Sequence, residues 1–564
     1  MKPFAPTTLA LASLLAVLSL LATGCGRVNE SEAAANVRLD PEDLVPSVGG
    51  WLIRNLGAEP KTLNPYTSSD VYSSTINGQV YEGLLTRDME TLEIKGVLAE
   101  SWEISEDGLT FTFKLREGVT FHDGHPLTIE DVKYSYDRIK DEKTLAPHRQ
   151  AALIYFTGAE ILDERTIQFT ANEVYFQNLL AIGGIEIIPQ HIWEENPNPS
   201  EEWDFNRHPA GRFPVGTGPY SFYTWATGKE IILQRYDEWN GLQRGEVSYP
   251  QRLIYRIVNE ASVLLLLLKN GTIDMYDRIP PLQWERQLDK PQWDLRFNKF
   301  EYEFPGYSYL GFNLRKPPFN DPKVRQALAH LIDVDELIEK VMKGMAVRTS
   351  GILPPAAPGY DQEVAPVPYD PEKARQLLAE AGWKDTTGDG ILDKDGQPFT
   401  FDLIIASASS TAPAASQYIK EDLLRAGINM EILKLDWQLM LARVLKHDFD
   451  AMMMGWALSL DSDPYGIWFS EEADKQDSHN AIGYRNERVD EILVTARKTL
   501  DDDQRNAMYR ELHQIIASEF PVVFLWVEKR LMAVDKRWYN IHFYLPRPCY
   551  NTDEWFVPKP LRQH

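Results

Sequence analysis

Residues 399–457 read FTFDLIIASASSTAPAASQYIKEDLLRAGINMEILKLDWQLMLARVLKHDFDAMMMGWA. Apolar runs alternate here with segments whose apolar residues recur at helical spacing, which predicts the order strand, helix, strand, helix, strand. Because this order implies a parallel sheet with right-handed crossovers, we predict an α/β fold. The strands are expected at 399–406, 429–435 and 449–456, and the helices at 415–426, closed by Gly427, and at 439–446.

Three loops follow the carboxyl ends of these strands, at 407–413, 436–437 and 456–464. In open sheets of this kind, ligands bind beyond those ends. We therefore expect the three loops, with Trp437 among their residues, to form one wall of a binding crevice. The helix that follows residues 407–411 is expected to offer free backbone N–H groups and a favourable dipole end to a ligand carboxylate.

The rest of the chain contains further turn and helix signals. Glu106-Asp107-Gly108 separates two alternating segments and predicts a hairpin. Thr128, followed three residues later by an aspartate, predicts a helix start, as do Asp321-Pro322 and Asp370-Pro371. An apolar strand at 522–527 follows two helices and is expected to cross back toward the first half of the chain.

Length and charge limit what the protein can be. The 564 residues are 43% hydrophobic and 25% charged, which excludes a disordered chain and suggests about three or four domains or sub-lobes. The 83 acidic residues outnumber the 58 Lys and Arg and give a formal net charge of −25. Because nucleic-acid binding requires cations that replace the counterions on phosphates, we expect no nucleic-acid partner.

The first 24 residues predict a signal peptide. They carry one charge, at Lys2, and an apolar stretch at 9–22 that is too short to span a bilayer. Residues 21–25, LATGC, resemble the lipobox at which bacterial lipoproteins are cut and their cysteine is acylated. We expect lipid attachment at Cys25, with a plain secretory peptide as the alternative. Cys549 would then have no disulfide partner within the chain.

Sequence motifs for catalysis are absent: the chain contains no P-loop, no Gly-x-Ser-x-Gly nucleophile elbow and no His-Glu-x-x-His. Asp461 and Asp463 form a close carboxylate pair, but no nucleophile or partner base accompanies them. We therefore predict that the protein is not an enzyme and that this pair binds a ligand amine or caps a turn. No cofactor is predicted.

Two segments resemble metal-binding patterns. His122-Asp123-Gly124-His125 brings two imidazoles and a carboxylate together, but no further His or Cys lies nearby in the sequence, so a solvated turn is favoured. The second candidate is a calcium loop, in which Gly396 stands at the position where a bidentate Glu is expected. A simple Asp/Gly turn is therefore favoured for this segment. No other metal site is assigned. The oxygen ligands of this weak candidate are Asp385, Thr387, Asp389 and Asp393.

Several stretches resemble the family 5 extracellular solute-binding proteins, the dipeptide and oligopeptide receptors of bacterial ABC importers. The clearest is residues 98–124, LAESWEISEDGLTFTFKLREGVTFHDG. The resemblance covers about residues 50–545. The other matching stretches are 59–65 (EPKTLNP), 81–84 (YEGL), 215–220 (VGTGPY), 271–274 (GTID), 312–314 (FNL), 317–319 (PPF), 324–328 (VRQAL) and 369–374 (YDPEKA).

The resemblance implies a two-lobed periplasmic-binding-protein fold of the large type II class, with an extra subdomain in the first lobe. Such proteins close around their ligand. The implied boundaries are 1–24 for the signal peptide, 25–49 for the lipidated cysteine and flexible tether, 50–312 for lobe I with its subdomain at about 83–205, 313–525 for lobe II, and 526–564 for the return to lobe I.

In peptide-binding members of this family, the segment after a Gly-Trp pair donates backbone hydrogen bonds to an extended peptide, and an Asp just beyond pairs with the ligand ammonium group. Gly455-Trp456 matches this pair. The usual Asp comes slightly earlier than Asp461, so turn capping by Asp461 and Asp463 is the alternative. No arginine is assigned to the ligand carboxylate. The implied substrate contacts are Trp456, Ala457, Leu458, Ser459 and Asp461, to which the strand-end argument adds Trp437.

The implied function is that of an exported lipoprotein, periplasmic or on the cell surface, which binds di- to oligopeptides and delivers them to an ABC permease in the inner membrane. We expect a monomer that is anchored to the membrane through Cys25. Three alternatives stay open: the same fold with a nickel complex, haem or an oligosaccharide as cargo, a sensor or adhesion lipoprotein without transport, and a hydrolase.

Overall fold

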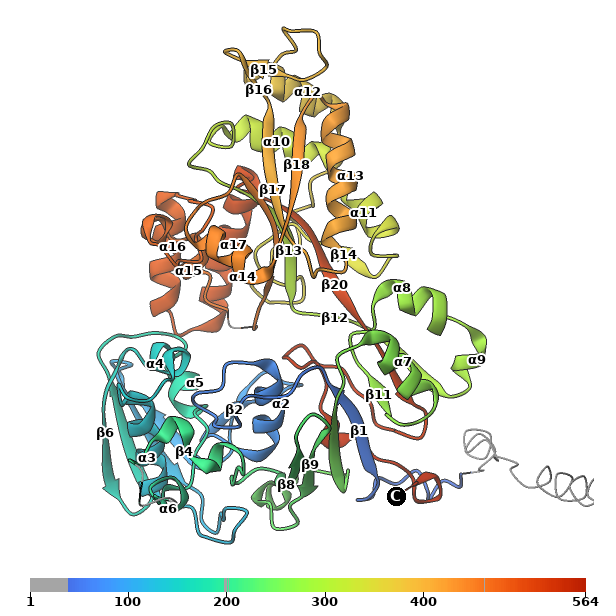
Figure 1. Ribbon diagram of the computed structural model, residues 1–564. Coiled ribbons are helices and arrows are strands. Elements are labelled where there is room, and N and C mark those ends of the chain that lie inside the picture. The colour runs from blue at the N-terminus through green and yellow to red at the C-terminus, as the bar shows by residue number, and fades with distance from the viewer. Residues whose placement is uncertain (1–38, 197–199, 201, 461, 564) are drawn as a thin grey trace, which may run out of the picture.

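The computed structural model describes residues 39–196, 200, 202–460 and 462–563 (Figure 1). The predicted signal peptide, Cys25, most of the predicted tether and Asp461 lie outside the described residues. Within the described part of the chain, no helix combines the length and the hydrophobicity that a membrane span requires.

A twelve-stranded mixed sheet extends through two halves of the molecule. Its strands are β1 (Trp51–Leu56), β8 (Tyr220–Ala226), β9 (Glu230–Arg235), β10 (Arg252–Ile257), β11 (Met275–Tyr276), β12 (Phe297–Glu303), β13 (Gly306–Phe312), β14 (Ala346–Arg348), β17 (Thr400–Ala406), β18 (Asn429–Leu435), β19 (Ala451–Ala457) and β20 (Val522–Asp535). The spatial order is β18-β17-β19-β13-β20-β11-β1-β10-β9-β8, and β12 and β14 also pair with β20.

The long strand β20 joins two lobes, which Figure 1 shows one above the other. Residues 522–528 of β20 pair with β13 and β14 in the second lobe, whereas residues 529–535 pair with β11 and β12 in the first. The predicted return of this strand toward the first half of the chain is confirmed. Only Phe304 and Pro305 separate β12 from β13, so the chain also crosses between the lobes there.

The lobe boundary predicted at residue 312 falls after β13. This strand pairs along its whole length with β19, from Gly306 opposite Ala457 to Phe312 opposite Ala451. Strand pairing therefore favours a first crossing near Phe304, and the division of the chain into lobes stays a proposal. The backbone N–H of Phe304 donates to the carbonyl of Glu528 (3.0 Å), which ties this crossing to β20.

Helices pack on both lobes. The first lobe contains α2 (Val71–Val80), α7 (Ala261–Lys269), α8 (Pro281–Gln283) and α9 (Pro291–Asp294). The second contains α10 (Pro322–Leu331), α11 (Val334–Lys340), α12 (Pro371–Glu380), α13 (Ala412–Arg425), α14 (Trp437–Leu445), α15 (Tyr465–Trp468), α16 (Glu487–Lys498) and α17 (Asp502–Glu519), with the small hairpin β15 (Asp393–Lys394) and β16 (Gln397–Pro398). Asp321 and Asp370 cap α10 and α12, as predicted.

The predicted strand–helix–strand–helix–strand unit is confirmed. β17 is parallel to β18 along its length and to β19 at Leu403 and Ile404. Helix α13 begins at Ala412, three residues before the predicted start, because a proline is tolerated in the first helical turn. Helix α14 begins at Trp437, two residues early, because the Asp436 carboxylate accepts a hydrogen bond from the N–H of Gln438.

Burial on both faces explains why these strands are apolar runs. Leu403 and Ile405 of β17 belong to one core cluster of the second lobe, and Ile404 between them belongs to the other. The same alternation places Met453 of β19 in the first cluster and Met452 in the second. A strand covered by helices on both sides carries apolar residues at every position, and this is the signal that the sequence displays.

A subdomain is inserted in the first lobe. It holds the antiparallel sheet β4-β5-β7-β6 and the hairpin β2-β3. The hairpin predicted around Gly108 is confirmed as β4 and β5, and Thr128 and Asp131 form a capping box at α3. Its elements are β2 (Leu85–Arg87), β3 (Ile94–Gly96), β4 (Ala99–Ile104), β5 (Thr110–Leu115), α3 (Ile129–Lys140), α4 (Pro147–Ala152), β6 (Phe156–Asp163), β7 (Thr166–Ala171), α5 (Asn178–Gly183) and α6 (Gln190–Trp193).

Candidate ligand-binding site

The carboxyl ends of β17, β18 and β19 point toward the first lobe (Figure 1). The N–H of Ser407 donates to the carbonyl of Leu435 (2.8 Å), which holds the ends of β17 and β18 together. The N–H of Leu458 donates to the carbonyl of Pro305 (3.0 Å), which ties the loop after β19 to the crossing between the lobes. The edge that the sequence predicts as a crevice wall therefore lies next to the crossings between the lobes, at Phe304 and along β20, which we call the hinge.

The last part of β19 has an open edge. On one side, residues 451–457 pair with β13. On the other side, β17 pairs only with Ala451 and Met452, so within the described residues 453–457 have no strand partner on that edge. Alternate residues of a strand direct their N–H and C=O groups to opposite edges, so part of this backbone is available to an added strand.

The predicted contact residues differ in accessibility. Ala457 and Ser459 are exposed, and Trp456 is partly buried with its ring 5.1 Å from that of His479. Leu458 is 7% exposed and belongs to a core cluster, so its side chain is turned away from solvent. Beside Trp456 lies a small cavity with room for about one water molecule. It is lined by Tyr307, Tyr309, Met452, Trp456, Ile467, Trp468, His479, Ile482 and Val522.

Trp437 is the first residue of α14 and is 45% exposed. A large exposed aromatic side chain at the carboxyl edge of the sheet offers an apolar surface to a ligand side chain. Its role as a contact residue stays a prediction.

Asp463 is engaged by protein groups. Its Oδ2 lies 2.8 Å from Nε of Arg497 and accepts from the hydroxyl of Tyr175 (3.0 Å), while Oδ1 accepts from the N–H of Tyr465 (3.0 Å). A carboxylate that is neutralised and bonded in this way has little capacity left for a ligand ammonium group. The turn-capping interpretation is thus favoured for Asp463. Asp461 lies outside the described residues, and its ligand role stays a prediction.

The prediction that the start of α13 offers free N–H groups is wrong. The hydroxyl of Ser409 accepts from the N–H of Thr411 (3.4 Å) and of Ala412 (3.0 Å). Pro413 has no N–H, and the next two amides donate to the carbonyl of Thr411. The Ser409 hydroxyl and a proline in the first turn together leave few of the donors that a ligand carboxylate would need.

The carboxylates of the calcium-loop candidate accept hydrogen bonds from nearby residues and so stabilise turns. Asp385 accepts from the N–H groups of Gly388 and Gly390 (3.0 Å for the second), and Asp393 accepts from the N–H and the hydroxyl of Thr386 (2.8 and 2.7 Å). Within the described residues these acids do not converge into a three-ligand group. The simple Asp/Gly turn is favoured.

The residues of the first lobe that contact the second lobe were not predicted from the sequence. Tyr175 and Phe176, between β7 and α5, contact the second lobe: Arg497 lies 4.9 Å from the centre of the Tyr175 ring, and Arg505 lies 4.3 Å from that of Phe176. The N–H of Phe176 also donates to the carbonyl of Arg497 (2.9 Å). Tyr175 is 288 positions from Asp463, so no local pattern connects them.

Burial, together with the neighbouring Asp463 carboxylate, raises the pKa of Tyr175. Its hydroxyl therefore stays protonated and acts as the donor to Asp463. Burial lowers the pKa of Arg497, but the Asp463 carboxylate together with Tyr155 and Tyr175 raises it overall. We call Tyr175, Phe176, Asp463, Arg497 and Arg505 the interlobe contact.

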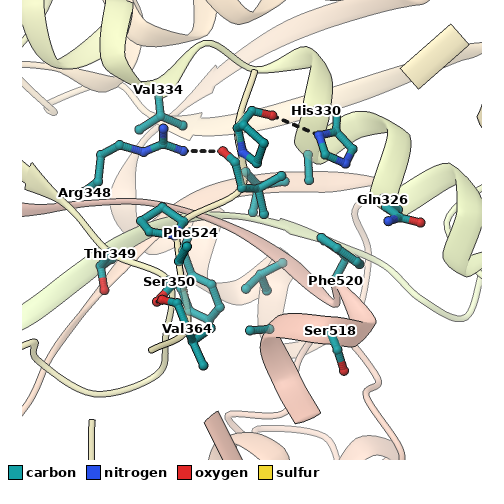
Figure 2. A pocket seen from close by; sticks show the side chains of 18 of the residues that line it. Gln326, His330, Val334, Arg348, Thr349, Ser350, Val364, Ser518, Phe520 and Phe524 are labelled. Carbon is teal, nitrogen blue, oxygen red and sulfur yellow. Dashed lines mark hydrogen bonds between the residues drawn. The ribbon is translucent and has the colours of Figure 1, made fainter. Parts of the chain in front are cut away.

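A cavity of about 400 Å³ lies within the second lobe (Figure 2). Its residues come from 326–373 and 514–524, so none belongs to the loops after β17, β18 and β19. Figure 2 shows His330 bonded to the carbonyl of Pro368 (2.9 Å) and Arg348 bonded to that of Val367, so these polar groups hold the loop that covers the cavity. We do not assign the ligand to it.

Comparison with known proteins identifies the family. Residues 93–477 match the model of the bacterial extracellular solute-binding proteins, family 5, middle region. The chain belongs to this family. Family 5 proteins bind solutes, so the prediction that the chain is not an enzyme is confirmed.

Two similar relatives of this family 5 protein are named for the solutes that they bind. The oligopeptide-binding protein AppA of Bacillus subtilis is 29% identical over 98% of this chain and 99% of its own length. The glutathione-binding protein GsiB of Escherichia coli K12 is 28% identical over 85% of this chain and 90% of its own length.

Solved structures confirm the two-lobed fold. AppA from Bacillus subtilis in complex with a nonapeptide gives a TM-score of 0.72 at 28% identity and covers 91% of this chain and 100% of that chain. CtaP, an ABC transporter substrate-binding protein from Listeria monocytogenes, gives 0.77 at 23% identity and covers 91% and 100%, which supports the fold alone.

Proposed function

We propose that this family 5 protein is the peptide receptor of an ABC importer. It is exported, held at the membrane through lipid on Cys25, and hands peptides to a permease. The observation that carries the peptide ligand is the open edge of β19 at residues 453–457, beside the hinge. An extended peptide that pairs with this edge satisfies backbone groups on both chains, whatever its side chains are.

The relatives support this choice of ligand class. AppA and GsiB, each matched over most of its length, are named for an oligopeptide and for the tripeptide glutathione. Both ligands carry the amide groups that strand addition requires. Trp437 and Trp456 flank the carboxyl edge of the sheet and supply apolar surface for peptide side chains.

The interlobe contact supports a closing mechanism. Its residues come from both lobes, and the two crossings at Phe304 and along β20 are the connections about which the lobes rotate. A peptide that binds the closed form better than the open form shifts the population toward closure. Closure presents the permease with a distinct liganded shape.

Peptide binding is tested by thermal unfolding and Trp fluorescence of protein that has been unfolded and refolded to remove bound ligand. Peptides of two to six residues are added, and each active peptide is compared with a copy N-methylated at alternate amides. At a hundredfold excess over Kd, a ligand stabilises by about 2.7 kcal/mol. The parent peptide is expected to shift the transition and the N-methylated copy is expected to fail, because methylation removes the donors that strand pairing uses.

Matched variants locate the site. Trp437→Ala is expected to weaken peptide binding. Phe213→Ala also removes an exposed aromatic ring, but from the first lobe, and is expected to leave peptide binding unchanged. N-acetylated peptides test an ammonium-binding acid, with Asp461→Asn as the corresponding variant. If no peptide shifts the transition, peptides are abandoned as cargo, and nickel chelates, haem and oligosaccharides are screened next.

The anchor is tested separately. Cells that express the full chain are labelled with a fatty-acid analogue, and Cys25→Ala is the control. Label on the wild type but not on the variant supports acylation of Cys25. Label on neither, with mature protein released from the cells, supports a plain secretory peptide.

A further inference from the structure

Three metal-ligand side chains meet on the surface of the subdomain. Asp123 and His125 come from the loop between β5 and α3, and His191 comes from α6. One carboxylate oxygen and one nitrogen of each imidazole all lie within 4.8 Å of one another. We propose that these three residues bind a divalent transition-metal ion, with Zn²⁺ as the first ion to test. This proposal is independent of the peptide ligand.

Distances in the cluster are close to those of a metal site. Asp123 Oδ2 lies 2.7 Å from His191 Nε2 and 3.2 Å from His125 Nδ1. Neighbouring donors of a tetrahedral zinc ion with bonds of about 2.0–2.1 Å are about 3.3 Å apart. Small side-chain rotations therefore make room for the ion. The two imidazole rings already lie side by side, with centroids 4.0 Å apart.

A tight loop holds the first two ligands. The N–H of Phe121 donates to the carbonyl of His125 (2.8 Å), and the N–H of Gly124 donates to the carbonyl of Phe121 (2.9 Å). Gly124 has φ +88°, which glycine adopts without strain. The N–H of His125 donates to Asp123 Oδ1 (3.1 Å), so the carboxylate is oriented with Oδ2 toward the imidazoles.

The third ligand is fixed to the same region by Asp131 of the capping box of α3. Asp131 Oδ2 accepts from the N–H and hydroxyl of Thr128 (2.9 and 2.7 Å), and its Oδ1 accepts from the N–H of Gln190 (2.8 Å). The residue before His191 is thereby attached to the start of α3. The ring of Phe121 also contacts the His191 ring edge-on, with centroids 6.0 Å apart.

The donor set selects the ion. Imidazole favours Zn²⁺, Ni²⁺ and Cu²⁺, whereas Mg²⁺ and Ca²⁺ favour sites made of oxygen ligands alone. The His125 side chain is 60% exposed, so water has access to complete the coordination shell. A bound ion would join the loop at 121–126 to α6, which is remote in sequence, and so stabilise the subdomain.

Figure 1 places α6 at the end of the first lobe that faces away from the second lobe. The ion therefore lies outside the candidate ligand-binding site. Residues 122–125 have no further His or Cys nearby in the sequence, which favours a solvated turn, but in the structure His191 supplies the third ligand.

Titration calorimetry with ZnCl₂ tests the proposal on protein that carries no polyhistidine tag, in a buffer that does not bind metals. We expect one Zn²⁺ per chain and a higher melting temperature with Zn²⁺. His125→Ala and His191→Ala are each expected to lower the affinity at least tenfold and to remove the thermal shift. His148→Ala removes an exposed histidine of the same subdomain, from α4, and is expected to bind Zn²⁺ like the wild type.

Unchanged Zn²⁺ affinity in both His125→Ala and His191→Ala overturns the proposal, as does a wild type whose melting temperature does not respond to Zn²⁺. Circular dichroism establishes that each variant is folded. If His191→Ala fails to fold, His125→Ala decides the test, because the more exposed side chain contributes less to packing.

Discussion

Tyr175 offers a measurable test of lobe closure, because its hydroxyl and its ring contact the second lobe through different atoms. Tyr175→Phe removes the hydrogen bond to Asp463 and keeps the ring beside Arg497. Tyr175→Ala removes both. Asp463 and Arg497 lie in the same lobe and stay paired when the lobes separate, so neither variant leaves an unpaired buried charge.

The hydroxyl of Tyr175 contributes modestly to the free energy of lobe closure. A hydrogen bond to a charged acceptor contributes about 1.5–3 kcal/mol. The hydroxyl of Tyr175 also lies 2.6 Å from Gln177 Oε1, in its own lobe, and this partner remains available when the lobes open. The net interlobe contribution is therefore about 1 kcal/mol, which corresponds to about a fivefold change in the ratio of closed to open protein.

The ring of Tyr175 contributes a similar amount to the free energy of lobe closure. A cation–π contact is worth about 0.5–1 kcal/mol when exposed and about 2 kcal/mol when desolvated. Tyr175 and Arg497 are partly buried, so we assign about 1 kcal/mol. Tyr175→Ala should then reduce closure by about 2 kcal/mol, or about thirtyfold.

Calorimetry with the peptide that gives the largest thermal shift measures the effect. If the unliganded protein is mostly open, Kd should rise about fivefold for Tyr175→Phe and about thirtyfold for Tyr175→Ala. Small-angle scattering should show the liganded variants to be less compact than the liganded wild type. Tyr223→Phe, which alters an exposed tyrosine on β8, serves as the matched control.

Equal affinities and equal radii of gyration for wild type, Tyr175→Phe and Tyr175→Ala would refute the reasoning. The interlobe contact would then be formed equally in the liganded and unliganded protein. A large fall in melting temperature for Tyr175→Ala alone would instead indicate damage to the first lobe, where its ring packs against Tyr155 and Phe176.

Three further predictions follow from the described contacts. Gly306→Ala places a Cβ against the carbonyl oxygen of Trp456, so it should destabilise by about 1–3 kcal/mol in urea unfolding, whereas Gly158→Ala, which meets nothing, should not. Ser409→Ala should cost about 1 kcal/mol of stability through the lost hydrogen bonds to the N–H groups of Thr411 and Ala412 but leave peptide Kd unchanged; a changed Kd would return α13 to the ligand site. Burial raises the pKa of Asp553 from 3.8 to about 7, helped by Glu554 and Glu246. Because the folded protein then binds more protons than the unfolded chain, stability should fall as the pH rises from about 4 to 7, by at most about 1.4 kcal/mol per unit. Asp553→Asn should remove this slope, and identical pH profiles for variant and wild type would contradict the assignment.

Much of the fold was predictable because the decisive signals are local. The apolar runs of β17 and β19 reflect burial on both faces, and Asp321 and Asp370 mark helix starts within a few residues. The lobe boundary was less predictable. β12 and β13 are similar strands separated by two residues, and only their pairing with opposite halves of β20 assigns them to different lobes.

The candidate site was predictable on one side only. Topology indicated the edge at the ends of β17, β18 and β19, but Tyr175 reaches Asp463 from 288 positions away. At the separate proposed metal site, His191 likewise reaches Asp123 from 68 positions away. Contacts of this kind depend on how finished elements pack. The contact of Ser409 is different, because it is local: a serine side chain readily accepts from backbone N–H groups two or three residues later, and this argues against free amides at that helix start.

The open edge of β19 and the hinge are mechanically connected. The N–H of Leu458 donates to the carbonyl of Pro305, and the next residue back along that crossing, Phe304, donates to Glu528 of β20. A peptide that pairs with residues 453–457 would order the strand that leads directly into this bond. Binding energy gained at the edge would thus act beside both crossings between the lobes. If peptides bind by strand addition as proposed, these bonds would couple that addition to closure without a separate relay.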